Sequence, residues 1–499
     1  MRIPKFDGNH FFIALLCQLT LWNVTVFFLK KYYMFEKNVY VSRREALMEI
    51  VSDGVVLLPA NEEVGMNYAG NPYHFRQDSN FLYYFGIDRP GMVGLIDVNA
   101  GESWILGQDP SLEDVVWMGE QPSVVSLAEA TGATHWGCLD QVKELLAKAQ
   151  SQGRKVHYLP PYRAATMLAL HQWCNVPLSR VVEGASEELI RAVVAQRSCK
   201  GPEEIREIER AVDITAAMHL AVMRAARPGM KEVQLAGIAR GIAIAAEGEV
   251  AYPVILTVQG HILHNHYHGN ELRAGQMVLG DFGAETKRHY AGDITRTFPV
   301  SGQFTSPQRD IYQIVLGAQL QAIQQIKPGV PYRDIHLLAA THLAEGLKAL
   351  GLMRGDVAEA VAAGAHALFF PHGLGHMLGL DVHDMEGLGE NYVGYDDEVQ
   401  RSEQFGTAYL RLGKRLKAGY VLTVEPGIYF IPALIAQWRV EKRHADFINY
   451  SEVAKWQSFT GIRIEDNVLV TEEGHRVLGE PLPKQIEEIE AIRKEALES

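Results

Sequence analysis

The sequence predicts a mixed α/β (α+β) protein with two domains. From residue 55 to about residue 174, short apolar runs alternate with helical stretches, a pattern typical of a mixed sheet. The pattern of apolar runs changes near residues 184–201, and the later strand-like runs are broken by glycine. We therefore expect a boundary close to residue 190, with residues 34–190 forming the first domain and residues 191–499 the second.

The composition is that of an ordinary globular protein of enzyme size. Of the 499 residues, 47% are hydrophobic and 21% are charged, which excludes the disordered and fibrous classes. The chain carries 47 lysines and arginines against 60 aspartates and glutamates, so its formal net charge is -13. This is the wrong sign for a protein that binds a phosphate backbone, and we expect no nucleic-acid partner.

The cysteines are few and scattered. They form no CxxC pair and lie at four positions: Cys17, Cys138, Cys174 and Cys199. This spacing fits neither a disulfide framework nor a thiolate zinc site. It predicts a reducing compartment, and we expect the protein to be cytoplasmic.

Residues 1–33 contain an uncharged stretch, Phe11–Leu29, close to the ~20 residues that span a bilayer core. Five polar side chains interrupt this stretch: Cys17, Gln18, Thr20, Asn23 and Thr25. Three interpretations stay open, namely an over-extended start before a natural beginning at Met34, a membrane anchor, and a buried helix. Basic residues come after the stretch, so an anchor would leave the rest of the chain in the cytoplasm.

The elements of the first domain can be predicted from its apolar runs. Strands are expected at VVLLP, MVGLID, SWILG and VHYLP, and a helix over Gln141–Ala149. The second domain begins with a long amphipathic helix, because Pro202 suits a first helical position. Apolar residues then repeat at steps of three and four: Ile205, Ile208, Val212, Ala216, Leu220 and Met223. The run Arg227-Pro228-Gly229 ends this helix.

Five strand-like runs come after this helix: AYPVILTV, QMVLGDFGAE, GDITRTFPV, GYVLTVEPGIYFI and GIRIEDNVLVT. The motifs HExxH, GxSxG, GxxxxGK and GxGxxG do not occur in the chain. The zincin, serine-hydrolase, P-loop and dinucleotide-binding classes therefore lack support.

Acidic residues occur in or at the ends of these apolar runs, at four positions: Asp281, Asp293, Glu425 and Glu465. A buried carboxylate without a partner is costly, and metal coordination or ion pairing relieves that cost. The Gly-rich segment from His372 to His376 adds imidazole ligands, so together these residues predict a shared metal site. Carboxylates with one or two imidazoles favour manganese over thiolate-preferring ions, with zinc and cobalt as alternatives.

Six motifs of the second domain occur in a fixed order: ILH, LGDFGAE, AGDITRTFPV, FFPHGLGHMLGLDVHD, LTVEPGIYF and GIRIED. In these motifs, and in YHFRQDSNFLYYFGID of the first domain, the chain resembles the pita-bread metallopeptidases of the aminopeptidase P and prolidase group. The resemblance spans about Met34 to the C-terminus. It implies an aminopeptidase P-like N-terminal domain over residues 34–190 and a C-terminal pita-bread catalytic domain over residues 191–499.

The resemblance also implies two divalent metal ions. Asp281 and Asp293 would hold one ion, and His376 and Glu425 would hold the other. Asp293 and Glu465 would bridge the pair. A water shared by two such cations ionises near neutral pH and becomes the attacking hydroxide. Glu425 can accept its proton and return it to the leaving amine.

Further side chains receive roles from the same resemblance. His264 in ILH and His383 in VHD would contact the substrate or its tetrahedral intermediate. Arg463 would brace the bridging carboxylates and, if its segment is a strand, would face the same way as Glu465. For His372 two interpretations stay open, a structural histidine in the Gly-rich turn and a substrate contact.

One spacing departs from the family pattern. Its two aspartates usually lie 11 positions apart, whereas here 293 − 281 = 12, with residues 285–289 lengthening the turn. An extra residue inside a strand would turn one side chain to the other face of the sheet. Because the flanking motifs are intact, we expect the turn to absorb the extra residue.

Arg411 is relevant to the length of the substrate. It precedes Glu425 by 425 − 411 = 14 positions, where prolidases have an arginine that binds the C-terminal carboxylate of a dipeptide. An exposed basic residue is the alternative. The resemblance therefore implies a dinuclear metal-dependent exopeptidase that hydrolyses the Xaa-Pro bond, leaning to Xaa-Pro dipeptides.

Three other functions stay open beside this one. Aminopeptidase P activity on longer Xaa-Pro peptides is the main alternative. A non-catalytic pita-bread binding protein and a metal-free hydrolase of the creatine amidinohydrolase type are remote alternatives. The expected partners are small proline-containing peptides, and the chain is expected to form a homo-oligomer, a dimer or larger.

Overall fold

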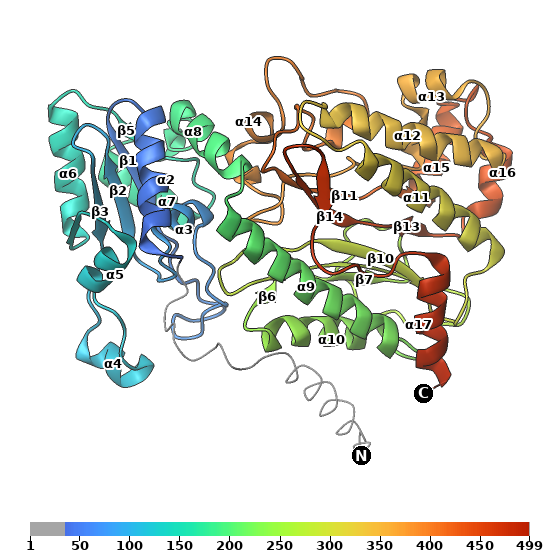
Figure 1. Ribbon diagram of the computed structural model, residues 1–499, viewed down its shortest axis with the longest axis horizontal. Helices are drawn as coiled ribbons and strands as arrows, with labels where there is room; N and C mark the ends of the chain where they lie inside the picture. The colour runs from blue at the N-terminus through green and yellow to red at the C-terminus, as the bar shows by residue number, and fades with distance from the viewer. Residues whose placement is uncertain (1–34, 499) are drawn as a thin grey trace, which may run out of the picture.

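The computed structural model describes residues 35–498. Figure 1 shows an amino-terminal part, coloured blue to teal, beside a larger carboxyl-terminal part coloured green to red. The predicted segment 1–33 lies outside the described residues. Of the helices in residues 35–498, none is long and apolar enough to cross a membrane.

The amino-terminal part is built on one five-stranded sheet of order β4-β3-β2-β1-β5. β1 and β3 both pair antiparallel with β2, whereas β5 on β1 and β4 on β3 are parallel. The strands are β1 (Val55–Pro59), β2 (Val93–Asp97), β3 (Glu102–Leu106), β4 (His135–Gly137) and β5 (Val156–His157). They coincide with the four predicted apolar runs, with β4 added.

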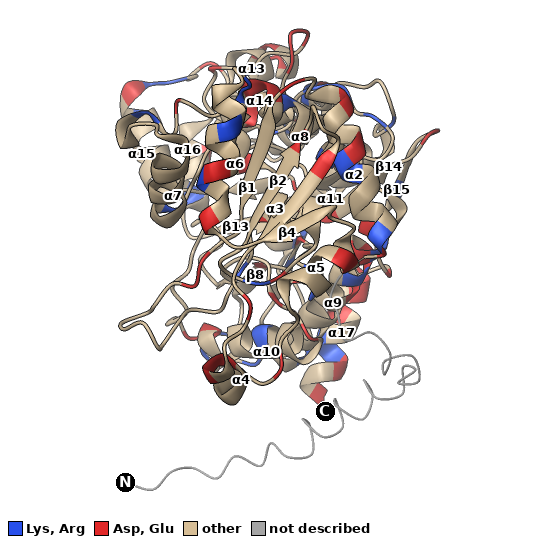
Figure 2. Cartoon of the chain, turned by 90° about the vertical axis from the view of Figure 1, so that its left-hand side faces the viewer, with Lys and Arg blue, Asp and Glu red and all other residues tan. Residues whose placement is uncertain are grey.

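Both faces of this sheet are buried. In β1, Val55 and Leu57 belong to one apolar cluster, and the alternate residues Val56 and Leu58 belong to another, as a strand period of two requires. Figure 2, in which the cartoon is coloured by residue type, shows acidic and basic residues interspersed over the outer helices, while β1 and β2 are largely tan. The prediction of a mixed α/β domain is confirmed.

Seven α-helices of the described residues belong to this part: α2 (Lys37–Ile50), α3 (Ser79–Phe85), α4 (Leu112–Met118), α5 (Val124–Thr131), α6 (Asp140–Ser151), α7 (Ala164–Cys174) and α8 (Glu187–Ser198), with the short 3₁₀ turn η2 (Leu178–Arg180). The predicted helix Gln141–Ala149 lies inside α6. Its buried residues Val142, Leu146 and Ala149 recur at helical spacing, so one face packs on the sheet. Cys138, Cys174 and Cys199 are free thiols.

The helix α8 joins the two parts of the chain. It packs against α2 on one side and against α14 of the carboxyl-terminal part on the other. The boundary expected near residue 190 falls in the first turn of this helix. It stays a prediction.

The carboxyl-terminal part begins with the long helix predicted from Pro202. The α-helices are α9 (Pro202–Ala225), α10 (Glu232–Ala245), α11 (Ser306–Gln324), α12 (Tyr332–Ala349), α13 (Val357–Ala363), α14 (Glu390–Gly394), α15 (Pro432–Glu441), α16 (Tyr450–Val453) and α17 (Ile486–Glu498). The 3₁₀ turns are η3 (Ala365–Leu368), η4 (Glu386–Leu388), η5 (Thr407–Tyr409) and η6 (Ala454–Trp456). Pro202 is the first residue of α9, and the helix ends shortly before Pro228, as predicted.

Short sheets form the centre of this part. The strands are β6 (Glu249–Val250), β7 (Ile255–Thr257), β8 (Met277–Phe282), β9 (Ala284–Glu285), β10 (Ile294–Pro299), β11 (Val421–Val424), β12 (Gly427–Tyr429), β13 (Gly461–Arg463), β14 (Asp466–Val470) and β15 (His475–Val477). They pair as β10-β8-β7, β11-β14-β15, β12-β13 and β6-β9. Each of the five predicted strand-like runs contains at least one of them.

Two pairs of helices enclose these strands. Figure 1 shows α9 and α10 below them and α11 and α12 above them. α9 contacts β9 and β10, α10 contacts β7, and α11 contacts β11 and β13. The strands are thus held between two helical layers, and the acidic residues at the strand ends face one another between them.

The hairpin from β8 to β10 keeps a single register. Met277 pairs with Pro299 at one end of the ladder, and Glu285 bridges Ala291 beside the turn. No residue is inserted between these pairs, so the turn absorbs the extra residue, as predicted. Asp281 lies opposite Thr295. Asp293 is two residues from Thr295, so Asp281 and Asp293 share a face of the hairpin.

Candidate metal centre

One cavity of about 430 Å³ gathers all the predicted site residues. These ten residues line it: His264, Asp281, Asp293, His372, His376, His383, Arg411, Glu425, Arg463 and Glu465. They come from several of the short sheets and from the loops before β11, so the enclosed fold brings them together. Tyr252, which the sequence did not identify, lines the same cavity.

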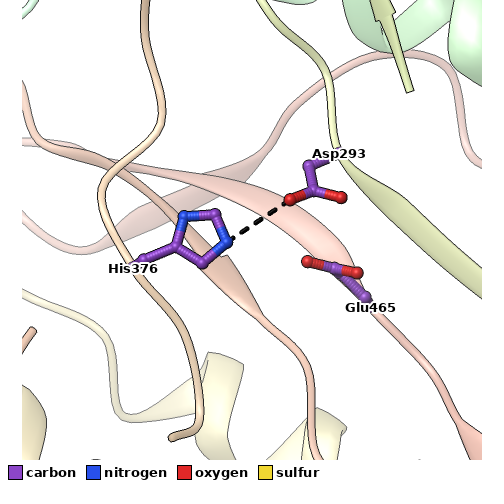
Figure 3. A group of neighbouring side chains, drawn as sticks. All are labelled: Asp293, His376 and Glu465. Atoms are coloured by element: carbon purple, nitrogen blue, oxygen red, sulfur yellow. Dashed lines mark ion pairs between the residues drawn. The ribbon is translucent and has the colours of Figure 1, made fainter. Parts of the chain in front are cut away.

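Three of the predicted metal ligands form a compact group. Asp293, His376 and Glu465 each offer one ligand atom, and these atoms lie within 4.8 Å of one another. Figure 3 shows the imidazole of His376 directed at the carboxylate of Asp293, with the carboxylate of Glu465 beside it. The distance from His376 Nε2 to Asp293 Oδ2 is 3.3 Å. All three side chains are buried, as a coordinating set must be.

The other two predicted ligands flank this group. Oε1 of Glu425 lies 3.6 Å from Nε2 of His376, and Glu425 comes directly after the last residue of β11. Asp281 is connected to Asp293 by Tyr252, whose hydroxyl lies within hydrogen-bond distance of Oδ1 of both aspartates and can donate its one proton to either. The five carboxylate and imidazole groups therefore belong to one continuous site.

The carboxyl groups of this site outnumber the basic side chains that contact them. Its four carboxylates face the guanidinium of Arg463 and the imidazole of His376. Burial, with Asp293 and Glu425 nearby, raises the pKa of Glu465 well above its usual range. Burial likewise raises the pKa of Glu425 to about 7. Buried carboxylates crowded in this way fit divalent cations, which supply the missing positive charge.

Arg463 contacts a different carboxylate from the ones expected. Its guanidinium forms an ion pair with Asp281 and donates from Nη1 to the Tyr429 hydroxyl at 2.8 Å. The Thr295 hydroxyl links Arg463 to Glu465. It accepts a hydrogen bond from Nε of Arg463 at 3.2 Å and donates one to Glu465 at 2.6 Å. Arg463 thus pairs directly with Asp281, the terminal ligand of the expected set, and its bracing of the bridging carboxylates stays a prediction. Strand β13 ends at Arg463, yet Arg463 and Glu465 still face the same cavity.

The three other predicted histidines occupy different positions in the cavity. The His383 ring centroid lies 4.2 Å from that of His376, and its Nδ1 contacts Glu386 Oε2 at 2.5 Å. Both ring nitrogens of His372 are engaged, Nε2 with the Tyr429 hydroxyl and Nδ1 with its neighbour's carbonyl. His264 is exposed in the turn after β7. Burial lowers the pKa of His372 to about 3, so its imidazole is neutral.

Arg411 lines the same cavity and contacts two acidic side chains. Its Nε lies 3.2 Å from Oε2 of Glu386 and 3.3 Å from Oε1 of Glu390. The Arg411 side chain is 32% exposed, so a substrate can reach it. The same Glu386 oxygen contacts His383 and Arg411, and this link was not expected from the sequence.

Comparison with known proteins agrees with this geometry. Residues 206–472 match the family model of metallopeptidase family M24, and residues 40–158 match the N-terminal domain of aminopeptidase P. The Xaa-Pro aminopeptidase of Escherichia coli K12 is 32% identical over 478 residues, covering 90% of this chain and 96% of that protein. The Xaa-Pro dipeptidase of Homo sapiens is 30% identical over 462 residues, covering 89% of each chain.

Solved structures show the same similarity. The aminopeptidase PepP of Pseudomonas aeruginosa superposes with a TM-score of 0.77 at 28% identity, covering 94% of this chain and 100% of that one. Aminopeptidase P of E. coli with the inhibitor Pro-Leu gives a TM-score of 0.75 at 30% identity, with 93% and 100% covered.

Fold and cavity together define a metallopeptidase with an aminopeptidase P-type N-terminal domain and a pita-bread catalytic domain. The chain belongs to metallopeptidase family M24. The resemblance deduced from the motifs is confirmed, and the family implies divalent metal ions. These matches favour an enzyme over the non-catalytic and metal-free alternatives.

Proposed function

We propose that this metallopeptidase hydrolyses Xaa-Pro dipeptides and releases the residue that precedes proline. The observation that carries the proposal is Arg411, a guanidinium in the same cavity as the five ligand side chains. A guanidinium binds a carboxylate through two parallel hydrogen bonds. A dipeptide has its C-terminal carboxylate at a fixed distance from the scissile bond, so Arg411 can select substrates of that length.

Activity on longer Xaa-Pro peptides is the second candidate. It is supported by the structural similarity to aminopeptidases P and by curated relatives named Xaa-Pro aminopeptidase. The two candidates share the cleaved bond and differ only in the group on the carboxyl side of proline. Arg411 favours the dipeptide, because a longer peptide has no carboxylate at that position.

The metal centre would hold two divalent ions through Asp281, Asp293, His376, Glu425 and Glu465. The resemblance implies that Asp293 and Glu465 would be shared by both ions, and both carboxylates belong to the compact group with His376. Manganese suits a set of four carboxylates and one imidazole, with zinc or cobalt as alternatives. When bound, the ions acidify the attacking water and polarise the scissile carbonyl.

The chain's own residues would move the protons. Glu425 accepts a proton from the attacking water and returns it to the prolyl nitrogen as the amine leaves. His264 and His383 would donate hydrogen bonds where negative charge develops on the carbonyl oxygen, each contributing about 10² to 10³ in rate.

Two features beyond the active site belong to the same proposal. We propose a cytoplasmic location, supported by the free thiols Cys138, Cys174 and Cys199. We also propose a homo-oligomer, supported by the exposed apolar side chains of α4, among them Trp117 at 76% exposed. Light scattering of the purified chain tests the oligomer.

A panel of peptides tests the proposed activity. Ala-Pro, its C-terminal amide and Ala-Pro-Ala share the scissile bond, and only Ala-Pro has a carboxylate on the proline. We expect the highest kcat/KM for Ala-Pro in the presence of manganese. A higher kcat/KM for Ala-Pro-Ala would favour the aminopeptidase P candidate, and hydrolysis of none of them would reject the proposed function.

A further inference from the structure

A second cavity of about 280 Å³ lies next to the metal centre. The amino-terminal part contributes segments 57–61, 78–80 and 159–170 to its lining, and the catalytic part contributes Arg197 and segment 381–388. His383 lines both this cavity and the metal-lined one. The two cavities are therefore neighbours, separated at the position of His383.

Three joined side chains form the partition between the cavities. Arg411 lines the metal-lined cavity, and Glu386 lines the second one. Oε2 of Glu386 lies 3.2 Å from Nε of Arg411 and 2.5 Å from Nδ1 of His383. This shared oxygen joins His383, Glu386 and Arg411, which connect the linings of the two cavities, and we call these three side chains the partition.

We propose that Glu386 sets the upper limit of substrate length by holding this partition closed. The inference rests on the proposed function, because it assumes a peptide whose proline lies beside Arg411. Residues on the carboxyl side of proline would have to pass between His383 and Arg411 to reach the second cavity. While Glu386 joins those two side chains, that passage is blocked.

The second cavity suits the continuation of a peptide. Its lining combines apolar side chains such as Pro160 and Leu170 with polar ones such as Asn61 and Tyr162. Its one guanidinium among the described residues, Arg197, is paired with Asp381 and Asp384 and is only 2% exposed, so a substrate carboxylate cannot reach it. A peptide would therefore enter through shape and backbone contacts rather than through its carboxylate.

Glu390 provides a matched control. It contacts the same guanidinium of Arg411 at 3.3 Å, yet it does not line the second cavity. After Glu386→Ala, Arg411 keeps its contact with Glu390, and after Glu390→Ala it keeps its contact with Glu386. The two variants remove the same charge from Arg411, and only the first one opens the partition. The side chain of Glu386 is 41% exposed, so neither folding nor the buried core depends on it.

The experiment compares kcat/KM for Ala-Pro-Ala and Ala-Pro in the manganese-loaded full chain. We expect Glu386→Ala to raise the tripeptide-to-dipeptide ratio by about tenfold or more, with a rise in tripeptide kcat/KM itself. Glu390→Ala should leave the ratio within about threefold of the parent chain. Glu386→Gln keeps the bulk and a hydrogen-bond acceptor, and it should retain the parent ratio.

Three results would overturn the inference. Equal ratios in Glu386→Ala and Glu390→Ala would assign the effect to the charge of Arg411. An equal fall in kcat on both peptides would mean that Glu386 only orients His383. Either result, with a parent chain that still prefers Ala-Pro, leaves the proposed function intact. A parent chain that prefers Ala-Pro-Ala contradicts both the inference and the dipeptidase proposal.

Discussion

Nε2 of His376 lies 3.3 Å from Oδ2 of Asp293, and this contact connects the Gly-rich segment that carries His376 with the hairpin that carries Asp293. The residue before His376 is Gly375, which allows the Gly-rich segment to pack closely against β11. A side chain on Gly375 would collide with the carbonyl oxygen of Thr423, so only glycine lets this segment lie against β11. The Gly-rich segment is therefore needed for packing as well as for the imidazole that it carries.

Tyr252 should tune the metal centre through its hydroxyl. The Tyr252→Phe variant loses the donor that connects Asp281 to Asp293 and keeps the ring. We expect manganese affinity or activity to fall by about 10- to 100-fold, the range measured when a partner of a metal ligand is lost. Titration of the metal-free variant with manganese measures the affinity. Tyr68→Phe, at a side chain 65% exposed, is the control, and equal affinities would contradict a role for the hydroxyl.

Arg411 should matter for dipeptides alone. Loss of one partner of a desolvated charge pair costs roughly 2 to 5 kcal/mol, so Arg411→Ala should lower kcat/KM for Ala-Pro by about 30-fold or more. The same variant should barely affect Ala-Pro-Ala. Arg415→Ala is the control, because Arg415 pairs with Glu398 and lies outside the cavity lining. Equal losses of kcat/KM on both peptides would favour the aminopeptidase P candidate.

The contact between the two parts of the chain should depend on pH. His289 lies in the β8–β10 turn, with Nε2 2.9 Å from Asp88 and Nδ1 2.9 Å from Glu285; the guanidinium of Arg76 also faces this cluster. Burial lowers the pKa of His289, but hydrogen bonds to Asp88 and Glu285 outweigh it and leave the pKa raised. The protonated imidazole therefore stabilises the fold below about pH 6.5, and this contribution is lost as pH rises through the raised pKa.

Thermal unfolding of His289→Asn checks the direction of this pH dependence. Asparagine tolerates the positive φ of 65° at this position. We expect the variant to be less stable by about 1 to 3 kcal/mol at about pH 6, with the difference shrinking by about pH 9. A difference in Tm that stays constant between these two pH values would show that the charge on His289 does not contribute.

Residues 1–33 should be dispensable for catalysis. Every residue that lines the metal-lined cavity lies at or after Tyr252, and every matched motif lies after Met34. A chain that begins at Met34 should be soluble and should keep the kcat/KM of the full chain for Ala-Pro. An insoluble or inactive product, beside a soluble full chain, would mean that the first residues belong to the fold.

The parts that sequence could predict share one property: each is encoded within a short segment. The start of α9 at Pro202, the hairpin turn before Asp293 and the ligand-bearing strand ends all depend on neighbours in the chain. The missed features depend on distant segments. In the sequence Tyr252 looks like any core tyrosine, and its contacts with Asp281 and Asp293 form only in the folded chain. Likewise, the sequence gives no sign that Glu386 contacts Arg411. The direct ion pair between Arg463 and Asp281 was missed for the same reason.

The central claim is that metal bound by the five named side chains drives Xaa-Pro hydrolysis. The most direct measurement is the rate of Ala-Pro hydrolysis against the number of manganese ions bound per chain, starting from metal-free protein. We predict no turnover without metal and a rise to full activity at about two ions per chain. Asp293→Ala should bind less metal and stay inactive while folded, whereas Asp310→Ala, an exposed residue of α11, should behave as the parent chain. Undiminished hydrolysis by the metal-free protein, or by Asp293→Ala, would contradict the dinuclear mechanism.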